Sequence, residues 1–563
     1  MLLALRSLLL VPLLLGEAIA AVDHRNFTAT VRIRNGTVVG VDDDSKEVQR
    51  FLGIPYAQPP VGTLRLQQAR PLNASFGALH ADSFGPACYG SELDSNPNSS
   101  EDCLTLNIWR PSRQHEEGEM KPVLVWFYGG GLRNGYTEDP RFEGTNMVRI
   151  SSEIKKEIVL VSVNYRLGPL GFLNGQQMAD LDLLNLGMLD QRLALHWVQE
   201  NIAAFGGDPK KVTLFGESAG AVSIYSHMIA YGGRDDKLFR AGILQSGGAF
   251  PLEHPNTTAF QETFDSLIED TSCSSFTNAP AKEQLECIRQ LPIETFLSSV
   301  GSSTGQSIDG SFSQTSIQFA LLAGKYVKVA TIVGTNTDEG TTSAPTGINT
   351  TGQLSIPLAD GYFRPKPLPN STVSKLLSLY PNDPRQGCPY NTGTIPLTGG
   401  TLDKKACSIF GDIVQIGPAR LIAKSLTKHN NNNNHDPRNS NNRHNSAPVY
   451  RYRFNHLPHD VDSSNITRGI TTGIEQRYIF SNLIPDHPWD RALAYEISAA
   501  WVSFAVDLNP NWGEESALPL WPEYGSEGKS MVFSGYGSEI EEDNYRAEGV
   551  EFIMDEVIPY GAL

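Results

Sequence analysis

A serine between two glycines is the first group in this sequence with the setting of a nucleophile. Gly216, Ser218 and Gly220 form the pattern G-x-S-x-G, after an apolar run and before a stretch that favours a helix. A sharp turn from strand to helix needs small flanking residues and leaves the serine hydroxyl exposed above the sheet. We expect Ser218 to be the nucleophile of an acyl transfer, with the backbone N–H of Ala219 facing the reacting carbonyl.

Three consecutive glycines, Gly129, Gly130 and Gly131, follow a second apolar run. Glycine lets the backbone approach a ligand closely and present successive N–H groups. A plain tight turn would have the same composition. Next to the serine turn, we expect an oxyanion hole made by the amides of Gly130, Gly131 and Ala219.

The elements that must position these groups are short, nearly continuous apolar runs. Such runs fit strands buried on both faces, as in a parallel sheet. They cover residues 123–128, 158–165, 212–216, 241–247 and 329–334, with a further strand at 449–454. A helical repeat over 189–205 lies between two of them. Strands alternating with helices indicate an α/β protein with an open sheet.

Several ordered motifs resemble the type-B carboxylesterase/lipase family, which includes cholinesterases and several fungal lipases. They lie at 51–62, 101–109, 128–131, 162–168, 190–220 and 244–247, so the resemblance covers most of the chain. It implies the α/β-hydrolase fold, with a large mostly parallel central sheet flanked by helices and helical segments over an active-site gorge. It also implies a single domain over 21–563, and hydrolysis of carboxylic esters through an acyl-enzyme without cofactor or metal.

The family's triad runs serine, acid, histidine along the chain. The acid belongs in a D-E-G motif after a strand. Here 329–340 supplies that motif, and Glu339 takes the position, with Asp338 as the alternative. The histidine belongs in a loop that resembles G-V-x-H-G-x-E. The matching loop is 469–480, and its histidine position holds Thr472.

Threonine cannot accept a proton near neutral pH, and a serine without a base is a weak nucleophile. Three interpretations follow. The protein is an esterase in which another histidine serves, from His456, His459 or His487. The fold carries out other chemistry, such as cyclisation, dehydration or transesterification of a secreted metabolite. The chain is a non-catalytic binding member of the family. We expect a small-molecule ester or related carbonyl compound as the partner.

The first twenty residues predict a signal peptide. Arg6 precedes an apolar run at 8–15, and Ala18-Ile19-Ala20 fits a cleavage site. The run is shorter than the roughly 20 residues that a bilayer needs. We expect no later segment to span a membrane, and therefore a chain that is secreted or enters the lumen of the secretory pathway. Sequons of the form N-x-S/T predict glycosylation at Asn26, Asn35, Asn73, Asn98, Asn256, Asn349, Asn370 and Asn465.

Six cysteines suit an oxidising compartment. The simplest of their possible pairings is local: Cys88 with Cys103, Cys273 with Cys287, and Cys388 with Cys407. The formal net charge of −17 argues against nucleic acid or an anionic membrane as partner.

An Asn-rich segment at 428–446 predicts a disordered surface loop, because it has too few apolar side chains to bury. Its histidines, His429, His435 and His444, are more often inert than metal-binding in such a tract. Nothing in the composition indicates an oligomeric state.

Overall fold

The computed structural model describes residues 27–90, 98–112, 119–248, 252–300, 303–360, 367–397, 399–432, 447–459, 468–484 and 487–559. The predicted signal peptide and the sequons at Asn26 and Asn465 lie outside these residues.

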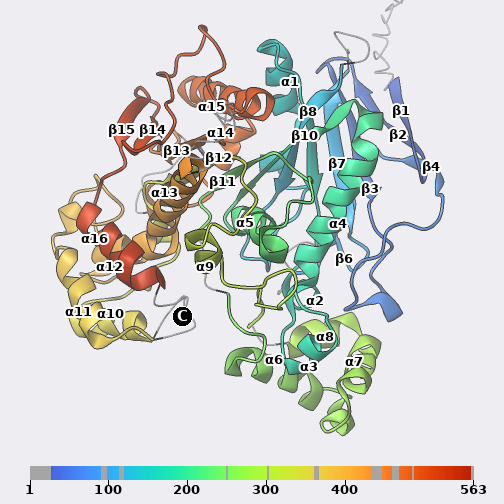
Figure 1. The fold of residues 1–563 in the computed structure, drawn as a ribbon, viewed down its shortest axis with the longest axis horizontal. Coiled ribbons are helices and arrows are strands. Elements are labelled where there is room, and N and C mark those ends of the chain that lie inside the picture. Colours follow the sequence, from blue (N-terminus) through green and yellow to red (C-terminus); the bar gives the residue numbers. More distant parts are fainter. Residues whose placement is uncertain are drawn as a thin grey trace, which may run out of the picture.

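One large mixed sheet organises the chain (Figure 1). Its strands, in spatial order, are β1 (Phe27–Ile33), β2 (Gly36–Asp43), β3 (Val48–Pro55), β7 (Thr105–Pro111), β9 (Val159–Val163), β8 (Lys121–Phe127), β10 (Gly207–Glu217), β11 (Ala241–Gln245), β12 (Ala330–Asn336), β13 (Val449–Phe454), β14 (Lys529–Phe533) and β15 (Glu539–Glu542). A further strand, β4 (Gly77–His80), pairs with β2, and β5 (Ala87–Cys88) pairs separately with β6 (Ser99–Ser100).

The middle of the sheet is parallel from β9 to β14 in spatial order. All six predicted strands are found there, and the expectation of a mostly parallel sheet is confirmed. The sequence did not reveal the antiparallel strands β1 to β3 and β7, or the edge strand β15. Because parallel strands point the same way, the ends of β8, β10, β12 and β13 meet at one edge. The loops that follow them carry the predicted site residues.

Helices pack on the central strands. The predicted helix at 189–205 is α4 (Leu186–Asn201) with the following turn η3 (Ile202–Phe205), and α5 (Ala219–Gly233) begins directly after Ser218. The remaining helices near the sheet are α1 (Thr145–Glu153), α2 (Gly168–Phe172), α9 (Ile317–Leu322), α13 (Gly417–Asn432), α14 (Gln476–Ile479) and α15 (Pro488–Asp507). The short turns are η1 (Gly62–Leu64), η2 (Pro140–Phe142), η4 (Ser274–Phe276), η5 (Glu339–Thr341), η6 (Pro384–Gln386), η7 (Asp412–Ile416) and η10 (Ile553–Val557).

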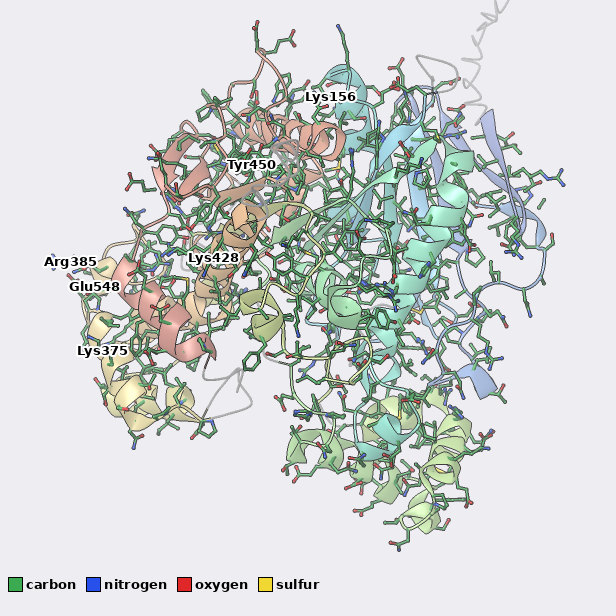
Figure 2. All side chains as sticks on the ribbon, viewed as in Figure 1. Lys156, Lys375, Arg385, Lys428, Tyr450 and Glu548 are labelled. Carbon is green, nitrogen blue, oxygen red and sulfur yellow. A yellow bond between two sulfur atoms is a disulfide. The ribbon has the colours of Figure 1, made fainter. Side chains whose placement is uncertain are left out.

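Two groups of helices lie beyond the sheet, each with its own apolar core. One contains α3 (Gln176–Asp180), α6 (Thr258–Glu269), α7 (Ala281–Gln290) and α8 (Ile293–Ser299), at the bottom of Figure 1. The other contains α10 (Thr351–Ala359), α11 (Asn370–Leu379), α12 (Asp403–Gly411) and α16 (Ala547–Phe552), at its lower left. Charged side chains, among them Lys375, Arg385 and Glu548, lie on the outer side of this second group (Figure 2).

One continuous helical stretch, Asp403–His429, corrects two expectations. By length and composition alone it could cross a membrane, although we expected no such segment. The most apolar part of this stretch is 94% buried inside the fold, as in a core helix. In addition, α13 extends to Asn432, so the first residues of the predicted Asn-rich loop are helical. His429 packs edge-on against Tyr326, while His435, His444 and the rest of the loop lie outside the described residues.

Two of the three predicted disulfides are present. Cys88 pairs with Cys103 and Cys273 with Cys287. The third prediction is wrong, because Cys388 and Cys407 are buried free thiols. The Cys388 thiol lies 3.7 Å from Asp338 Oδ1, to which it can donate a hydrogen bond. Burial raises the pKa of the Cys388 thiol, so it stays protonated, whereas disulfide chemistry proceeds through the thiolate.

Alkylation of the unfolded, unreduced protein is expected to modify two cysteines, Cys388 and Cys407, because the other four are held in disulfides. The folded protein is expected to resist the same reagent, since both free thiols are buried. Intact-mass and peptide mass spectrometry measure both results. An unfolded protein that takes up no label would show that the third pair is oxidised.

Candidate active site

Ser218 lies at a strained turn between β10 and α5. Its φ of 52° and ψ of −120° are rare for a residue with a side chain. Its N–H donates to the carbonyl oxygen of Gln245 at 2.8 Å. A Cβ added to Gly220 would lie 2.0 Å from the Phe127 carbonyl oxygen, and one on Gly216 would lie 2.7 Å from the same atom. Close packing of the turn against the end of β8 therefore requires both glycines.

The glycine loop after β8 lies beside this turn. A Cβ on Gly129 would be 3.1 Å from the Ser218 Cβ. Gly130 and Gly131 have φ values of 102° and 67°, which glycine adopts without strain. Within the described part of the chain, the amides of Gly130, Gly131 and Ala219 find no hydrogen-bond acceptor. Ala219 opens α5, whose first-turn N–H groups favour negative charge. The three amides are thus available to a developing oxyanion.

Glu339, the predicted acid, is almost fully buried, with 1% of its surface exposed. Its Oε1 accepts a hydrogen bond from the Asn336 N–H at 2.7 Å, and its Oε2 accepts one from Thr472 Oγ1 at 2.5 Å. Burial raises the pKa of Glu339, and the Thr472 and Asn336 hydrogen bonds oppose this rise. The position that the sequence motif assigns to the histidine is therefore next to the acid, and a threonine hydroxyl occupies it.

Asp338, the alternative acid, binds backbone groups instead. Its carboxylate accepts hydrogen bonds from the N–H groups of Ile470 and Tyr390, both at 2.8 Å. Its own N–H donates to the Ile470 carbonyl oxygen at 2.9 Å. Asp338 thus anchors the loop that carries Thr472, and Glu339 is the residue that faces the threonine.

The three candidate histidines form a separate cluster. His456 Nε2 lies 2.6 Å from Asp490 Oδ1, and His459 Nδ1 lies 2.8 Å from the same oxygen. His487 stacks on His459 with ring centroids 4.0 Å apart. Among the described residues, no imidazole is hydrogen-bonded to Ser218, so the structure does not support a relocated histidine base.

The same cluster has the residue types of a metal site, since ligand atoms of His456, His459 and Asp490 lie within 4.8 Å of one another. However, His456 Nδ1 accepts the Gly535 N–H at 3.2 Å. The other ring nitrogen must then carry the proton that is shared with Asp490. His456 has no lone pair left for a metal ion, and we interpret the cluster as a hydrogen-bond network around Asp490.

Two further carboxyl groups lie at the site, and the sequence analysis gave them no role. Glu217 is 4% exposed and Glu475 is 1% exposed. Asn336 Nδ2 donates to Glu475 Oε2 at 2.6 Å. Burial, together with the charge of Glu339, raises the pKa of Glu475 to about 7, although the Asn336 bond opposes the rise. Burial raises the pKa of Glu217 well above its usual value, and the charges of Glu475 and Glu339 raise it further. Both residues lie inside the motifs of their neighbours, Glu217 within 216–220 and Glu475 within 469–480, and this position next to Ser218 and Thr472 is the signal that the sequence offers.

A model of the carboxylesterase family matches residues 28–553. The chain belongs to the carboxylesterase family. It is 30% identical to "Secreted lipase 1" of Botryotinia fuckeliana, over 96% of this chain and 95% of that lipase. It is 33% identical to "Lipase 5" of Diutina rugosa, over 68% of this chain and 75% of that protein. The crystal structure of Aspergillus niger EstA matches with a TM-score of 0.80 and 27% identity, over 94% of this chain and 99% of that one.

These similarities confirm the predicted family and the α/β-hydrolase fold. They also confirm that the chain is a member of a family of carboxylic ester hydrolases.

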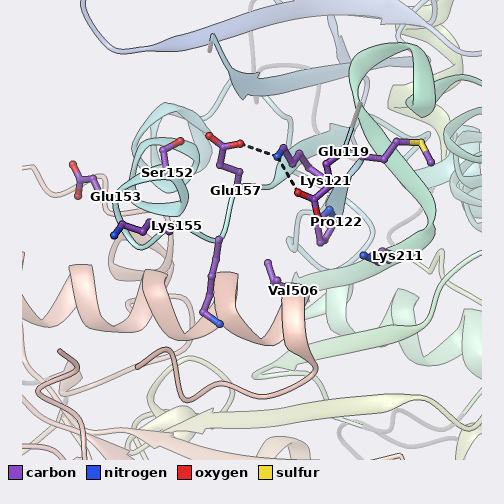
Figure 3. A pocket seen from close by; sticks show the side chains of 11 residues that line it. Glu119, Lys121, Pro122, Ser152, Glu153, Lys155, Glu157, Lys211 and Val506 are labelled. Atoms are coloured by element: carbon purple, nitrogen blue, oxygen red, sulfur yellow. Dashed lines mark ion pairs between the residues drawn. The ribbon is translucent and has the colours of Figure 1, made fainter. Parts of the chain in front are cut away.

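The chain also has a pocket of about 520 Å³ away from Ser218 (Figure 3). The residues that line it include Lys121, Ser152, Glu157 and Lys211. The Lys121 Nζ lies 3.1 Å from Glu157 Oε2. These residues lie at or near the starts of β8, β9 and β10, whereas Ser218 follows the end of β10. Because the strands are parallel, the pocket is at the opposite edge of the sheet and is not the candidate active site.

Substitution Gly220→Ala is expected to destabilise the fold by about 3 kcal/mol or more, because its methyl group would overlap the Phe127 carbonyl oxygen. The matched control is Gly305→Ala, where a Cβ meets nothing within 4 Å. The control is expected to stay within about 0.5 kcal/mol of the wild type. Urea unfolding followed by circular dichroism measures both values. Equal stability of the two variants would contradict the close approach at the serine turn.

Proposed function

We propose that this chain is a secreted carboxylic ester hydrolase that acts on a small-molecule ester. The observation that carries the proposal is the serine turn, at which the hydroxyl of a strained, half-buried serine adjoins backbone amides without acceptors among the described residues. In this assignment Ser218 is the nucleophile, Glu339 holds the acid position, and the oxyanion hole consists of the amides of Gly130, Gly131 and Ala219.

The chemical step is acyl transfer. Ser218 Oγ attacks the ester carbonyl carbon, and the oxygen charge that develops is stabilised by the three amides. The alcohol then leaves, and water hydrolyses the acyl-enzyme. Loss of one triad member in such enzymes costs on the order of 10⁴–10⁶ in turnover and leaves roughly 10³–10⁴ over the uncatalysed rate. With Thr472 at the histidine position, we expect the hydrolysis to be slow compared with that of a complete triad.

Secretion is supported by the predicted signal peptide, the two disulfides and the similarity to a lipase named as secreted. Glycosylation is proposed at the sequon asparagines with exposed side chains, Asn73, Asn98, Asn256, Asn349 and Asn370. Asn35 is half-buried, and its side-chain amide donates to the Ala74 carbonyl oxygen at 3.1 Å. A glycan on Asn35 would compete with that hydrogen bond, so we propose it as the least occupied of the described sequons.

A second candidate is a carboxylesterase-like enzyme for cyclisation, dehydration or transesterification. It is favoured by the combination of Thr472, hydrogen-bonded to Glu339, with an intact serine turn. Such an enzyme would polarise a carbonyl without acylating Ser218. Labelling of Ser218 by a fluorophosphonate at an ordinary esterase rate would argue against it. A non-catalytic binding role is the least supported, because the nucleophile is retained.

Substitution Thr472→His is expected to raise kcat/KM for p-nitrophenyl acetate by about 100-fold or more, since it places an imidazole next to Glu339. Thr471→His is the matched control. The hydroxyl of Thr471 accepts a hydrogen bond from Thr341 rather than contacting Glu339, so this variant is expected to gain nothing. Ser218→Ala is expected to abolish the gain. A Thr472→His variant no faster than the wild type would contradict the assignment of the base position.

A further inference from the structure

We propose that Glu217 takes the proton of Ser218 through one water molecule, held where the family's imidazole would lie. The negative charge of Glu475 then influences how readily Glu217 gains or loses a proton. This inference rests on the proposed function and identifies the base that acts in place of a histidine.

The Glu217 carboxyl lies between the two loops that meet at the serine. A Cβ on Gly129 would be 2.4 Å from Glu217 Oε2 and 3.1 Å from the Ser218 Cβ. The Glu217 carboxyl and the Ser218 side chain therefore both lie next to Gly129, close to each other. A Cβ on Gly473 would be 3.4 Å from Glu217 Oε1. The carboxyl thus faces the oxyanion loop with one oxygen and the Thr472 loop with the other. Glu217 and the serine hydroxyl are close enough for one water molecule to bridge them.

Thr472 leaves room for that water. Its side chain is shorter than an imidazole, and its hydroxyl is committed to Glu339 Oε2 and to Thr342 Oγ1, which lies 3.3 Å away. Several buried polar atoms around the carboxyls lack a hydrogen-bond partner within the described part of the chain: Asn336 Oδ1, Tyr452 Oη and Gln476 Oε1. Buried polar atoms of this kind are normally satisfied by ordered water.

The charge of the cluster suits proton transfer. Three buried carboxyls, Glu217, Glu339 and Glu475, interact with one another, and burial raises the pKa of each. The other titratable groups facing Glu217 are Arg141, Tyr165 and Tyr452. Like charges in a low-dielectric site cannot all ionise together, so the three carboxyls keep protons to higher pH than free carboxyls do. A carboxyl whose pKa is raised is, once ionised, a stronger general base than a free carboxylate.

The proposed step balances without a further reactant. Ser218 Oγ forms a bond to the ester carbonyl carbon, and the π-electron pair moves to the oxygen held by the amides. The hydroxyl proton passes to the bridging water, which gives one of its protons to ionised Glu217. Protonated Glu217 returns a proton through the water to the leaving alkoxide as its C–O bond breaks. Water then attacks the acyl-enzyme by the same route, which restores Ser218.

The test measures Glu217→Gln in two backgrounds, the wild type and Thr472→His, by hydrolysis of p-nitrophenyl acetate and by the rate of Ser218 labelling with a fluorophosphonate. In the wild type, Glu217→Gln is expected to lower kcat/KM by about 100-fold or more, because it removes the proposed base. In the Thr472→His background the imidazole supplies the base, and the loss is expected to be below about tenfold. Labelling rates are expected to follow the same pattern.

Two further variants separate the roles. Glu475→Gln removes a neighbouring negative charge and so lowers the pKa of Glu217. The rise of kcat/KM with pH is then expected to move to lower pH, with a similar plateau. Glu157→Gln, a buried glutamate at the opposite edge of the sheet, is the matched control and is expected to leave both rates unchanged. Thermal unfolding verifies that each variant is folded.

The outcomes are distinguishable. The inference is overturned if Glu217→Gln matches the wild type, or if it lowers both rates equally in the two backgrounds, as a purely structural role would. In either case the proposed function stands, provided that Ser218→Ala is inactive and Thr472→His is faster. If Ser218→Ala hydrolyses the ester as fast as the wild type, the proposed function fails, and the inference fails with it.

Discussion

The contact between the first turn of α5 and the carbonyl oxygen of Phe127 holds the candidate site together. Gly220 lies so close to this oxygen that even a methyl group would overlap it. The contact sets how far β8 and β10 are separated at their ends, and hence how near the glycine loop lies to Ser218. A larger residue at 220 would move the loop and the helix apart and would separate the oxyanion amides from the nucleophile. Backbone packing therefore defines the site before any side chain takes part.

The electrostatics of the site differ from those of a triad with histidine. An imidazole next to Glu339 can become a cation and offset the charge of the acid. Thr472 stays neutral, so the buried carboxyls must offset their repulsion by holding protons. In the proposed mechanism, Glu217 and Glu475 then supply the acid–base capacity of the site in place of the loop at 472.

The sequence predicted the parts of the fold that depend on local pattern. Continuous apolar runs identified the parallel strands, because both faces of those strands are buried. The strands toward the two ends of the sheet escaped detection, since β1 to β3 and β15 expose part of their length and lack such runs. The Cys388–Cys407 pairing was wrong although the two side chains interact, because burial raises the pKa of the Cys388 thiol and disfavours the thiolate that disulfide formation requires. Likewise, Glu217 and Glu475 are 258 positions apart in numbering, and only the meeting of two loops brings their carboxyls together.

The anchoring of the Thr472 loop has a consequence for how the family can change. Asp338 holds this loop through the backbone of Ile470, and Asn336 Nδ2 donates to the Thr471 carbonyl oxygen at 2.7 Å. None of these bonds involves the side chain at 472. The loop backbone is therefore held independently of the side chain at 472, which adds its own hydrogen bond to the buried Glu339. A residue that can make that bond, a hydroxyl or an imidazole, can stand at 472 while the backbone around it is preserved.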